Sequence, residues 1–305
     1  MRAAFDTAVP AIARATAVSL LPSNPGPRTL EGIERAAGDS DELVRRAAAE
    51  ALQSVDPATR LRIGRPLLDD SIRTVRLPAV SALAAVPAAQ WDSKDRERFD
   101  QVAEEYRRSQ RVNADRPESW LNLGAFEGRL QRSAAAEAAF RSAIRLAPGF
   151  AAGYVALAQL HADGGREADG ERVLREGLAA EPESADLHHA LGLSLVRQNR
   201  TPEALAPLGA AARLDTASAR FSYVYAVALF DLGDPQQAIA VLTAAETRHP
   251  ADRDILQALA SFSLQTADLP AARRWAERLV EVAPDDAGAR QQLEQIRRMR
   301  VLDRP

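Results

Sequence analysis

Small and apolar residues recur at fixed positions through five consecutive segments of equal length, which together span residues 117–286. In the first half of each segment they favour the fourth, seventh, eighth and eleventh positions, as Tyr154, Leu157, Ala158 and His161 do in the second segment. Offsets of three, one and three residues place these side chains on one face of an α-helix. The twentieth position of each segment is also small. The pattern therefore predicts two packed helices per segment.

Regular breaks separate these predicted helices. Turn residues such as Gly165, Asn199 and Gly233 stand between the two halves of a segment, and a proline closes four of the five segments, with Thr216 in its place in the third. Proline pushes the preceding residue out of the helical region, so it ends a helix. A fixed period of this length is typical of a solenoid.

The same residues resemble the tetratricopeptide repeat, whose pattern is W-x2-L-G…A-x3-F…P. The first segment departs from it at Glu127, where an aromatic residue is usual, and matches it at Trp120, Leu123, Gly124, Ala136, Phe140, Ala143 and Pro148. The resemblance implies an all-α fold, an α–α superhelix or solenoid. Its five repeats would be residues 117–150, 151–184, 185–218, 219–252 and 253–286. Residues 287–305 would supply a C-terminal capping helix and tail.

A looser repeat precedes this array. The run LVRRAAAEAL (residues 43–52) recurs in similar form as TVRLPAVSAL (residues 74–83), and the helix-capping residues Asp41 and Ser71 stand before these runs. The pattern resembles HEAT repeats of the short bacterial kind, which implies HEAT-like helical repeats in residues 1–90, the first one truncated. We therefore expect the C-terminal part of a longer protein, because an uncapped solenoid end exposes apolar surface.

A polar segment at residues 93–113 links the two arrays. Its apolar residues, among them Phe99, Val102 and Tyr106, recur at helical spacing and form one stripe. We expect a linker helix that packs on the first tetratricopeptide repeat and caps the array.

The composition limits the possible partners. Apolar residues make up 46% of the 305 residues and charged residues 27%, and the net charge of −3 gives no long-range attraction to nucleic acid or an anionic membrane. No apolar run reaches the roughly 20 residues of a membrane span. The chain has no cysteine, which excludes disulfides and covalent haem attachment within it. We expect a protein or peptide partner, no nucleic acid, no membrane insertion and no cofactor.

In the tetratricopeptide family, the first helices line a concave groove that holds the ligand. Carried over by position, the resemblance implies a partner-binding groove lined by Leu121, Val155, Gln159, His189, Leu193, Arg220, Tyr223, Val227, Phe230 and Gln257. Tyr223 and Phe230 are the expected anchors, because aromatic residues dominate interface energetics. The alternative is that these side chains only pack against the neighbouring helix. The family's carboxylate clamp needs Lys and Asn at set positions, and its absence argues against a receptor for chaperone C-termini.

The charged residues and the residue types used in catalysis form no pattern that indicates a metal site or a catalytic site. The thirteenth positions alternate in sign, which predicts either cross-repeat ion pairs or independent solvated charges at Arg129, Asp163, Arg197 and Asp231. His188 and His189 are adjacent, so on a helix they point in different directions and cannot chelate one metal ion. No G-x-S-x-G, Walker or H-E-x-x-H motif is present. We do not expect an enzyme.

Three functional hypotheses follow. The first is a scaffold for protein–protein interactions that binds a peptide or helix in the groove. The second arises because HEAT-like repeats running into tetratricopeptide repeats are similar to the C-terminal region of bacterial multihaem c-type cytochromes. It implies an accessory or truncated module of an electron-transfer protein, itself without haem. The third is an assembly subunit that self-associates. A complete chain would be cytoplasmic, whereas a fragment of an exported cytochrome-like protein would be periplasmic.

Overall fold

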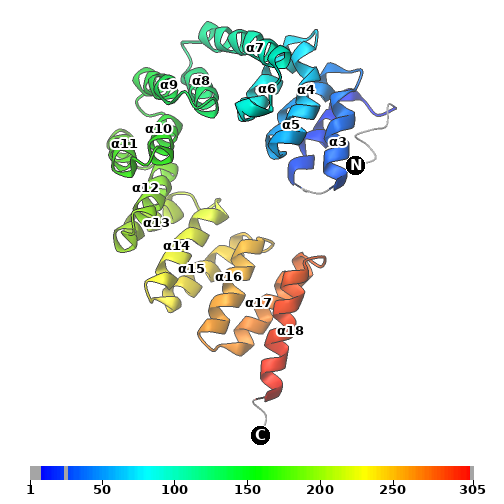
Figure 1. The fold of residues 1–305 in the computed structure, drawn as a ribbon. Helices are drawn as coiled ribbons and strands as arrows, with labels where there is room; N and C mark the ends of the chain where they lie inside the picture. Colours follow the sequence, from blue (N-terminus) through cyan, green and yellow to red (C-terminus); the bar gives the residue numbers. More distant parts are fainter. Residues whose placement is uncertain (1–7, 24–26, 303–305) are drawn as a thin grey trace. The chain divides into compact units, whose positions relative to one another are not determined.

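The computed structural model describes residues 8–23 and 27–302, and the regular elements in those ranges are all helices (Figure 1). The chain divides into two compact units, residues 1–146 and 147–305, and each is described by itself. Residues 1–7, 24–26 and 303–305 lie outside the described residues. They include the start of the predicted HEAT-like segment and the end of the predicted tail.

The first unit is a succession of packed helices. Helices α2, α4, α6 and α7 pack one against the next and share a core whose largest buried side chains include Leu52, Leu68, Leu83 and Phe99. Short 3-10 turns at Leu21–Ser23, Leu52–Ser54, Pro66–Asp69 and Ala88–Gln90 adjoin these helices. The α-helices described in this unit are α2 (Ala11–Ser19), α3 (Pro27–Ala37), α4 (Glu42–Ala51), α5 (Pro57–Gly64), α6 (Arg73–Leu83), α7 (Ser93–Val112), α8 (Pro117–Arg129) and α9 (Ser133–Leu146).

Arginines that recur at a constant interval along the chain connect successive turns of this unit. Arg45 donates to the backbone carbonyl of Asp39 at 2.8 Å, and Arg76 donates to that of Asp70 at 2.7 Å. Each carbonyl lies just before the helix that carries its arginine. Arg14, Arg45 and Arg76 each also form an ion pair with a carboxylate from another turn or helix. These ion pairs are Arg14–Asp39 at 2.8 Å, Arg45–Asp70 at 2.6 Å and Arg76–Glu105 at 2.7 Å. The arginines therefore set the register between neighbouring helices.

Helix capping in this unit follows the prediction at one of two positions. The Asp41 carboxylate accepts a hydrogen bond from the backbone N–H of Leu43 at 2.9 Å, which confirms the predicted cap of α4. Before α6 the prediction of Ser71 is wrong, because the N-cap residue is Ile72 and no side chain caps this helix. The carboxylate of Asp70 accepts from the N–H of Ile72 at 2.8 Å and so orders the turn just before the helix.

A buried ion pair joins α7 to α8. Arg107 donates from Nε to Oε1 of Glu127 at 2.5 Å and from Nη2 to Oε2 at 3.2 Å, and both side chains are less than a tenth exposed. The guanidinium also pairs with Glu104 and lies 5.5 Å from the centre of the Phe126 ring. This contact explains why Glu127 stands where the tetratricopeptide pattern has an aromatic residue: it neutralises a buried arginine of the preceding helix.

The second unit continues with helices that restart at the same interval as the sequence repeats, in phase with α8 and α9. Its first helices are α10 (Ala151–Asp163), α12 (Ala185–Arg197), α14 (Ala219–Asp231) and α16 (Arg253–Gln265). Their partners are α11 (Glu167–Ala180), α13 (Thr201–Leu214), α15 (Pro235–Arg248) and α17 (Leu269–Val282), and α18 (Ala287–Leu302) follows. The turn residues Gly165, Asn199 and Gly233 have positive φ angles of 72°, 59° and 84°, a region that glycine and asparagine tolerate.

Paired helices approach one another at small residues. A Cβ built on Gly192 of α12 would lie 2.4 Å from the Leu208 side chain of α13, and one on Gly170 of α11 would lie 2.9 Å from the Ala158 carbonyl oxygen of α10. Ala226, which takes the place of Gly192 in the next repeat, is fully buried. Interiors are packed too tightly to admit a further methyl group without a shift.

Gly192→Ala is expected to destabilise the protein by about 1–3 kcal/mol, because the added methyl group overlaps Leu208. Gly128→Ala in α8 is the matched control, since its new Cβ would lie 3.9 Å from its nearest neighbour. There, helix propensity alone predicts a gain of up to about 1 kcal/mol. Urea denaturation measures both changes, and a stabilising Gly192→Ala would contradict close approach at this position.

Removal of one partner of the buried ion pair is expected to be costly. Glu127→Ala leaves Arg107 charged and buried, with only the exposed Glu104 in close contact, and should cost about 3–5 kcal/mol. The double variant Arg107→Met with Glu127→Leu should be far closer to the wild type, because no charge is then left buried. Urea denaturation of the single and double variants tests this. A single-variant cost below about 1 kcal/mol would show that the pair is solvated.

Candidate partner-binding face

The first helices of the second unit display a regular surface, which we call the first-helix face. It consists of the fifth, ninth and twelfth positions, which share one side of each helix because they are separated by four and three residues. Its members are Val155, Gln159, Ala162, His189, Leu193, Val196, Tyr223, Val227, Phe230, Gln257, Ser261 and Leu264. Arg220 adjoins this face one turn before Tyr223. Leu121 belongs to the first unit.

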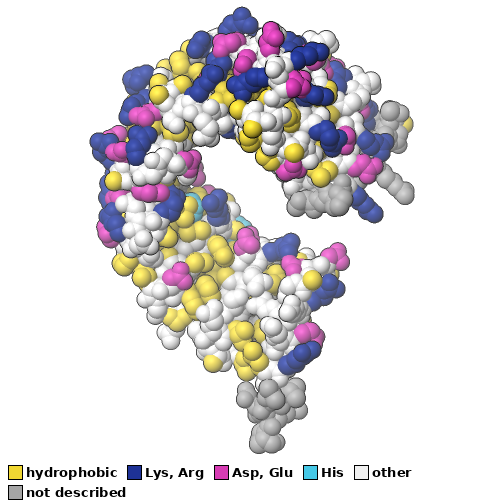
Figure 2. Space-filling view, in the orientation of Figure 1, with side chains coloured by type: hydrophobic (Ala, Val, Ile, Leu, Met, Phe, Trp, Pro, Cys, Tyr) yellow, Lys and Arg dark blue, Asp and Glu magenta, His cyan; other side chains and the backbone are white. Residues whose placement is uncertain are grey.

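Apolar surface is concentrated on α12 and α14. Val155, Leu193, Tyr223, Val227 and Phe230 are half-buried, so each leaves part of its side chain at the surface. The three residues of α14 also pack against the core cluster of the second unit. The more polar members of the predicted set are exposed, namely Gln159, Arg220 and Gln257. Hydrophobic side chains gather over the region of α14 to α16 in the space-filling view, where charged side chains are sparse (Figure 2).

Phe230 is held in place by the next repeat. Its ring stacks on that of Phe262 in α16, with 3.9 Å between ring centres and 15° between planes. Phe262 is 8% exposed and stands at the tenth position of its repeat, which the repeat pattern does not mark. The sequence therefore indicated the surface residue Phe230 but not the residue that supports it.

His189 is buried, although it occupies a position of the first-helix face. Its side chain is 7% exposed, and its ring lies 4.6 Å from that of Phe221 in α14. Neither ring nitrogen has a hydrogen-bond partner. Burial, with a smaller effect from the positive charge of Arg220, lowers the pKa of His189 to about 4, although Asp186 opposes the shift. At neutral pH, His189 is an uncharged packing residue that offers a partner little surface.

Neutral polar groups bound the apolar surface on the side of α16 and α18. Gln257 donates to Gln292 at 2.9 Å, and both glutamines donate to Ser261 Oγ, at 3.4 and 3.2 Å respectively. Because these groups satisfy one another, the network supplies a polar edge without a net charge.

Of the two alternatives for the thirteenth positions, the ladder of ion pairs between neighbouring first helices is not formed by the described residues. Arg197 pairs with Glu167 at 2.8 Å, and Asp163 accepts a hydrogen bond from Gln159 at 2.6 Å. Glu167 lies in the first turn of α11, which packs directly against α12. Arg197 thus reaches a carboxylate of the preceding second helix, which spacing along the first helices does not reveal.

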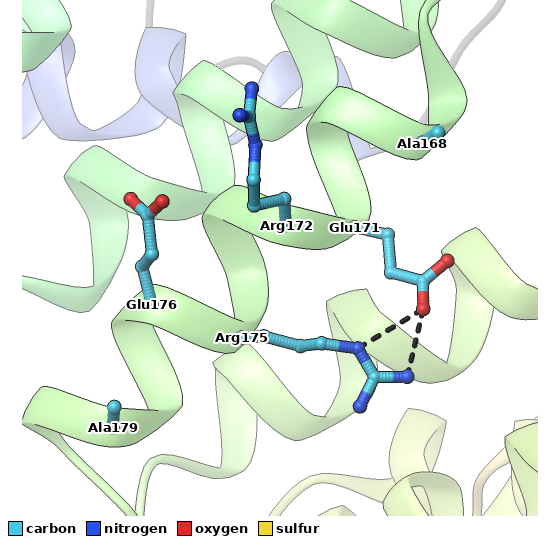
Figure 3. Close-up of a pocket in the computed structure, with 6 residues that line it drawn as sticks. All are labelled: Ala168, Glu171, Arg172, Arg175, Glu176 and Ala179. Atoms are coloured by element: carbon cyan, nitrogen blue, oxygen red, sulfur yellow. Dashed lines mark hydrogen bonds and ion pairs between the residues drawn. The ribbon is translucent and has the colours of Figure 1, made fainter.

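A shallow hollow of about 560 Å³ lies on one helix, α11 (Figure 3). Glu171, which lines it, accepts from Arg175 at 2.8 Å, Arg200 at 2.7 Å and Gln198 at 3.0 Å. Burial raises the pKa of Glu171, but these hydrogen bonds outweigh that effect and the pKa is lowered. Since the carboxylate is already satisfied by its neighbours, the hollow is not a good candidate for ligand binding.

Metal clusters and membrane-spanning helices are both absent from the described residues. His, Asp and Glu side chains there form no group of three that could hold a metal ion. In the same ranges, no helix is both long and apolar enough to cross a membrane.

Comparisons with family models identify the repeats. Residues 117–150 and 229–296 match models described as tetratricopeptide repeat, and residues 169–245 match a model described as anaphase-promoting complex, cyclosome, subunit 3. A search of curated protein sequences finds no match. The helical fold defines the chain as an all-α repeat protein. It contains tetratricopeptide repeats, at residues 117–150 and 229–296.

Solved structures resemble the chain at low sequence identity. Yeast Tom70 has a TM-score of 0.58 and 17% identity, and the match covers 98% of this chain and 66% of that one. YrrB, described as a TPR protein with an unusual peptide-binding site, has a TM-score of 0.47 and 17% identity, with 61% and 96% coverage. PilF of Pseudomonas aeruginosa has a TM-score of 0.49 and 17% identity, with 61% and 90% coverage. At such identities, the resemblance to Tom70 concerns the fold alone.

The depressed pKa of His189 predicts a pH dependence of stability. The unfolded chain binds this proton with an ordinary pKa near 6.5 and the folded chain with one of about 4. The stabilisation from neutral His189 is therefore present above pH 6.5 and is lost as the pH falls toward 4. His189→Leu should lose less stability between pH 7.5 and 4.5 than the wild type does in urea denaturation.

His188→Gln is the matched control for removal of an imidazole, because His188 is the next residue on the same helix and is only half-buried. An equal change of pH dependence in both variants would show that the effect does not come from burial of His189. An unchanged dependence in His189→Leu would contradict the assignment.

Proposed function

We propose that this protein is a scaffold for protein–protein interactions, and that it binds a segment of its partner on the first-helix face of α12, α14 and α16. The observation that carries the proposal is the run of half-exposed apolar side chains along α14, namely Tyr223, Val227 and Phe230. Contiguous apolar surface of this kind marks interaction sites on soluble proteins. Tetratricopeptide repeat proteins typically act as such scaffolds and are generally not enzymes.

Tyr223 and Phe230 are the proposed anchors. Aromatic residues near the centre of an interface often contribute about 2 kcal/mol or more on truncation. The stack on Phe262 restricts the Phe230 ring before any partner binds, so little side-chain entropy remains to be lost. Packing on a neighbour and binding a partner are therefore compatible roles for this residue, rather than alternatives.

We propose, in addition, that the segment before α7 consists of HEAT-like repeats. The recurrent arginines support this, because Arg45 and Arg76 occupy equivalent places in the two similar runs and make the same kinds of contact. Each binds the turn before its own helix and a carboxylate from elsewhere in the unit. The relation to multihaem cytochromes stays a prediction, and no contact in the described residues favours it.

Tyr223→Ala with Phe230→Ala is expected to weaken binding of the natural partner at least tenfold, because the apolar anchors are lost. The wild-type chain and the double variant are used to capture proteins from the source cells. Proteins that only the wild-type chain captures are purified, and their affinities for both chains are measured. Circular dichroism and thermal melting of each variant establish that it remains folded.

Tyr225→Ala is the matched control. Tyr225 lies on the same helix, but its ring packs over Gly209 of α13, with atoms 3.1–3.3 Å from a Cβ built there. Its loss should lower the melting temperature and leave partner affinity unchanged. Equal loss of affinity in Tyr225→Ala and in the double variant would mean that all three residues act only through folding.

A further inference from the structure

We infer that the second unit contains a hinge between the helix pairs α12–α13 and α14–α15, about which its two halves bend as rigid bodies. The N-terminal half consists of α10 to α13, and the C-terminal half consists of α14 to α18. Each half is held together by contacts that are not repeated between the halves. We call residues 207–215, at the end of α13 and just after it, the hinge segment.

Polar cross-links hold the N-terminal half together. Glu167 pairs with Arg197 at 2.8 Å, and Glu171 accepts hydrogen bonds from Gln198 at 3.0 Å and Arg200 at 2.7 Å. These contacts join α11 to α12 and to the turn that follows α12. They act together at one boundary, so they hold these neighbouring helix pairs in one register.

The same cross-links cannot form at the next boundary. One repeat period later, Thr201 and Leu205 stand in place of the two glutamates, and Asp231 and Asp234 stand in place of the two arginines. A hydroxyl group and a leucine side chain offer these carboxylates no positive charge. The boundary between α13 and α14 therefore lacks the ion pairs that join α11 to α12.

Apolar packing holds the C-terminal half together. Its buried apolar side chains form one core cluster, which runs from Ala226 in α14 to Ile296 in α18. Phe230 of α14 stacks on Phe262 of α16 within this half. Helices α14 and α16 pack directly on one another, as α10 and α12 do in the N-terminal half, whereas α12 and α14 pack less closely.

The ring contact between α12 and α14 leaves a buried polar group unsatisfied. His189 lies 4.6 Å from the Phe221 ring, with 35° between the ring planes, and neither of its ring nitrogens has a hydrogen-bond partner. A buried polar group without a partner loses the hydrogen bonds that water would supply. Bending that separates α12 from α14 would return these bonds to His189.

Helix α13 contains two residues that weaken it inside the hinge segment. Pro207 lies in the helix interior and has no N–H, so the carbonyl of Glu203 loses its usual bond within the helix. Gly209 follows two residues later and has a much lower helix propensity than alanine. Sharp bends in helices occur mainly at proline. The other second helices of this unit, α11, α15 and α17, carry no proline beyond their first turn.

The turn after the hinge segment is tied to the C-terminal half. Thr216 stands where the other repeats have a closing proline, and its carbonyl accepts a hydrogen bond from Nε2 of His249 at 3.0 Å. His249 is the C-cap residue of α15. Because the turn is bound to α15, it moves with the C-terminal half, and the bending is confined to residues 207–215.

Spin labels measure this bending directly. The chain contains no cysteine, so labels attach only at introduced cysteines. Arg172→Cys with Ala240→Cys places them at exposed positions of α11 and α15, on opposite sides of the hinge segment. Ala240→Cys with Gln295→Cys, also at exposed positions, is the matched pair within the C-terminal half. Circular dichroism of each labelled chain establishes that it is folded.

Double electron–electron resonance should give a distance distribution about twice as wide for the pair across the hinge segment as for the pair within the C-terminal half. Equal widths would overturn the hinge. The measurement uses no partner, so its outcome is independent of the proposed function.

Thr216→Pro with Pro207→Ala should narrow the wide distribution to the width of the matched pair. Asp215 already has the extended backbone that a residue before proline favours, with φ −126° and ψ 92°. Alanine in place of Pro207 supplies the missing N–H for Glu203. Pro235→Ala is the control, because a proline in the first turn of α15 interrupts no helix bond, and it should leave the width unchanged. An unchanged width in the double variant would show that residues 207–215 are not the hinge.

Discussion

The close approach of two helices at a small residue is the constraint on which each tetratricopeptide repeat depends. Gly192 leaves no room for a methyl group against Leu208, and Gly170 lies against the backbone of Ala158. Such contacts fix the distance and register of a helix pair. The larger core residues can then fill the remaining space at the density of an interior. Because the fourth, seventh, eighth and eleventh positions serve this packing, the fifth, ninth and twelfth keep exposed surface at every repeat of the second unit except at His189, and their chemistry can vary.

Polar contacts add register between successive helices. In the first unit, the regularly spaced arginines join successive turns, and Arg107 with Glu127 joins α7 to α8. In the second unit, Glu167 and Glu171 of α11 pair with arginines that follow in α12 and the next turn. Exposed pairs of this kind contribute only about 0–1 kcal/mol each. The buried pair is different, since loss of one partner leaves a desolvated charge.

The proposed binding surface follows from this division of positions. Along α14, Tyr223, Val227 and Phe230 pack against the core cluster with one side and leave apolar surface exposed with the other. The neighbouring helices supply neutral polar groups at the edge, such as Gln257 and Ser261. The second unit thus combines a repetitive interior with a surface that differs from repeat to repeat.

The sequence by itself determined the helices, their repeat period, their turns and the positions at which they pack, because these depend on local propensity and on spacing along the chain. It also indicated Tyr223 and Phe230, because position within a repeat specifies the side of the helix. Only the tertiary structure decided which side chains meet across helices: Phe262 beneath Phe230, Phe221 against a buried His189, Glu167 with Arg197, and Glu127 with Arg107. These contacts depend on the distance and rotation between helices, which the repeat pattern of one chain does not specify.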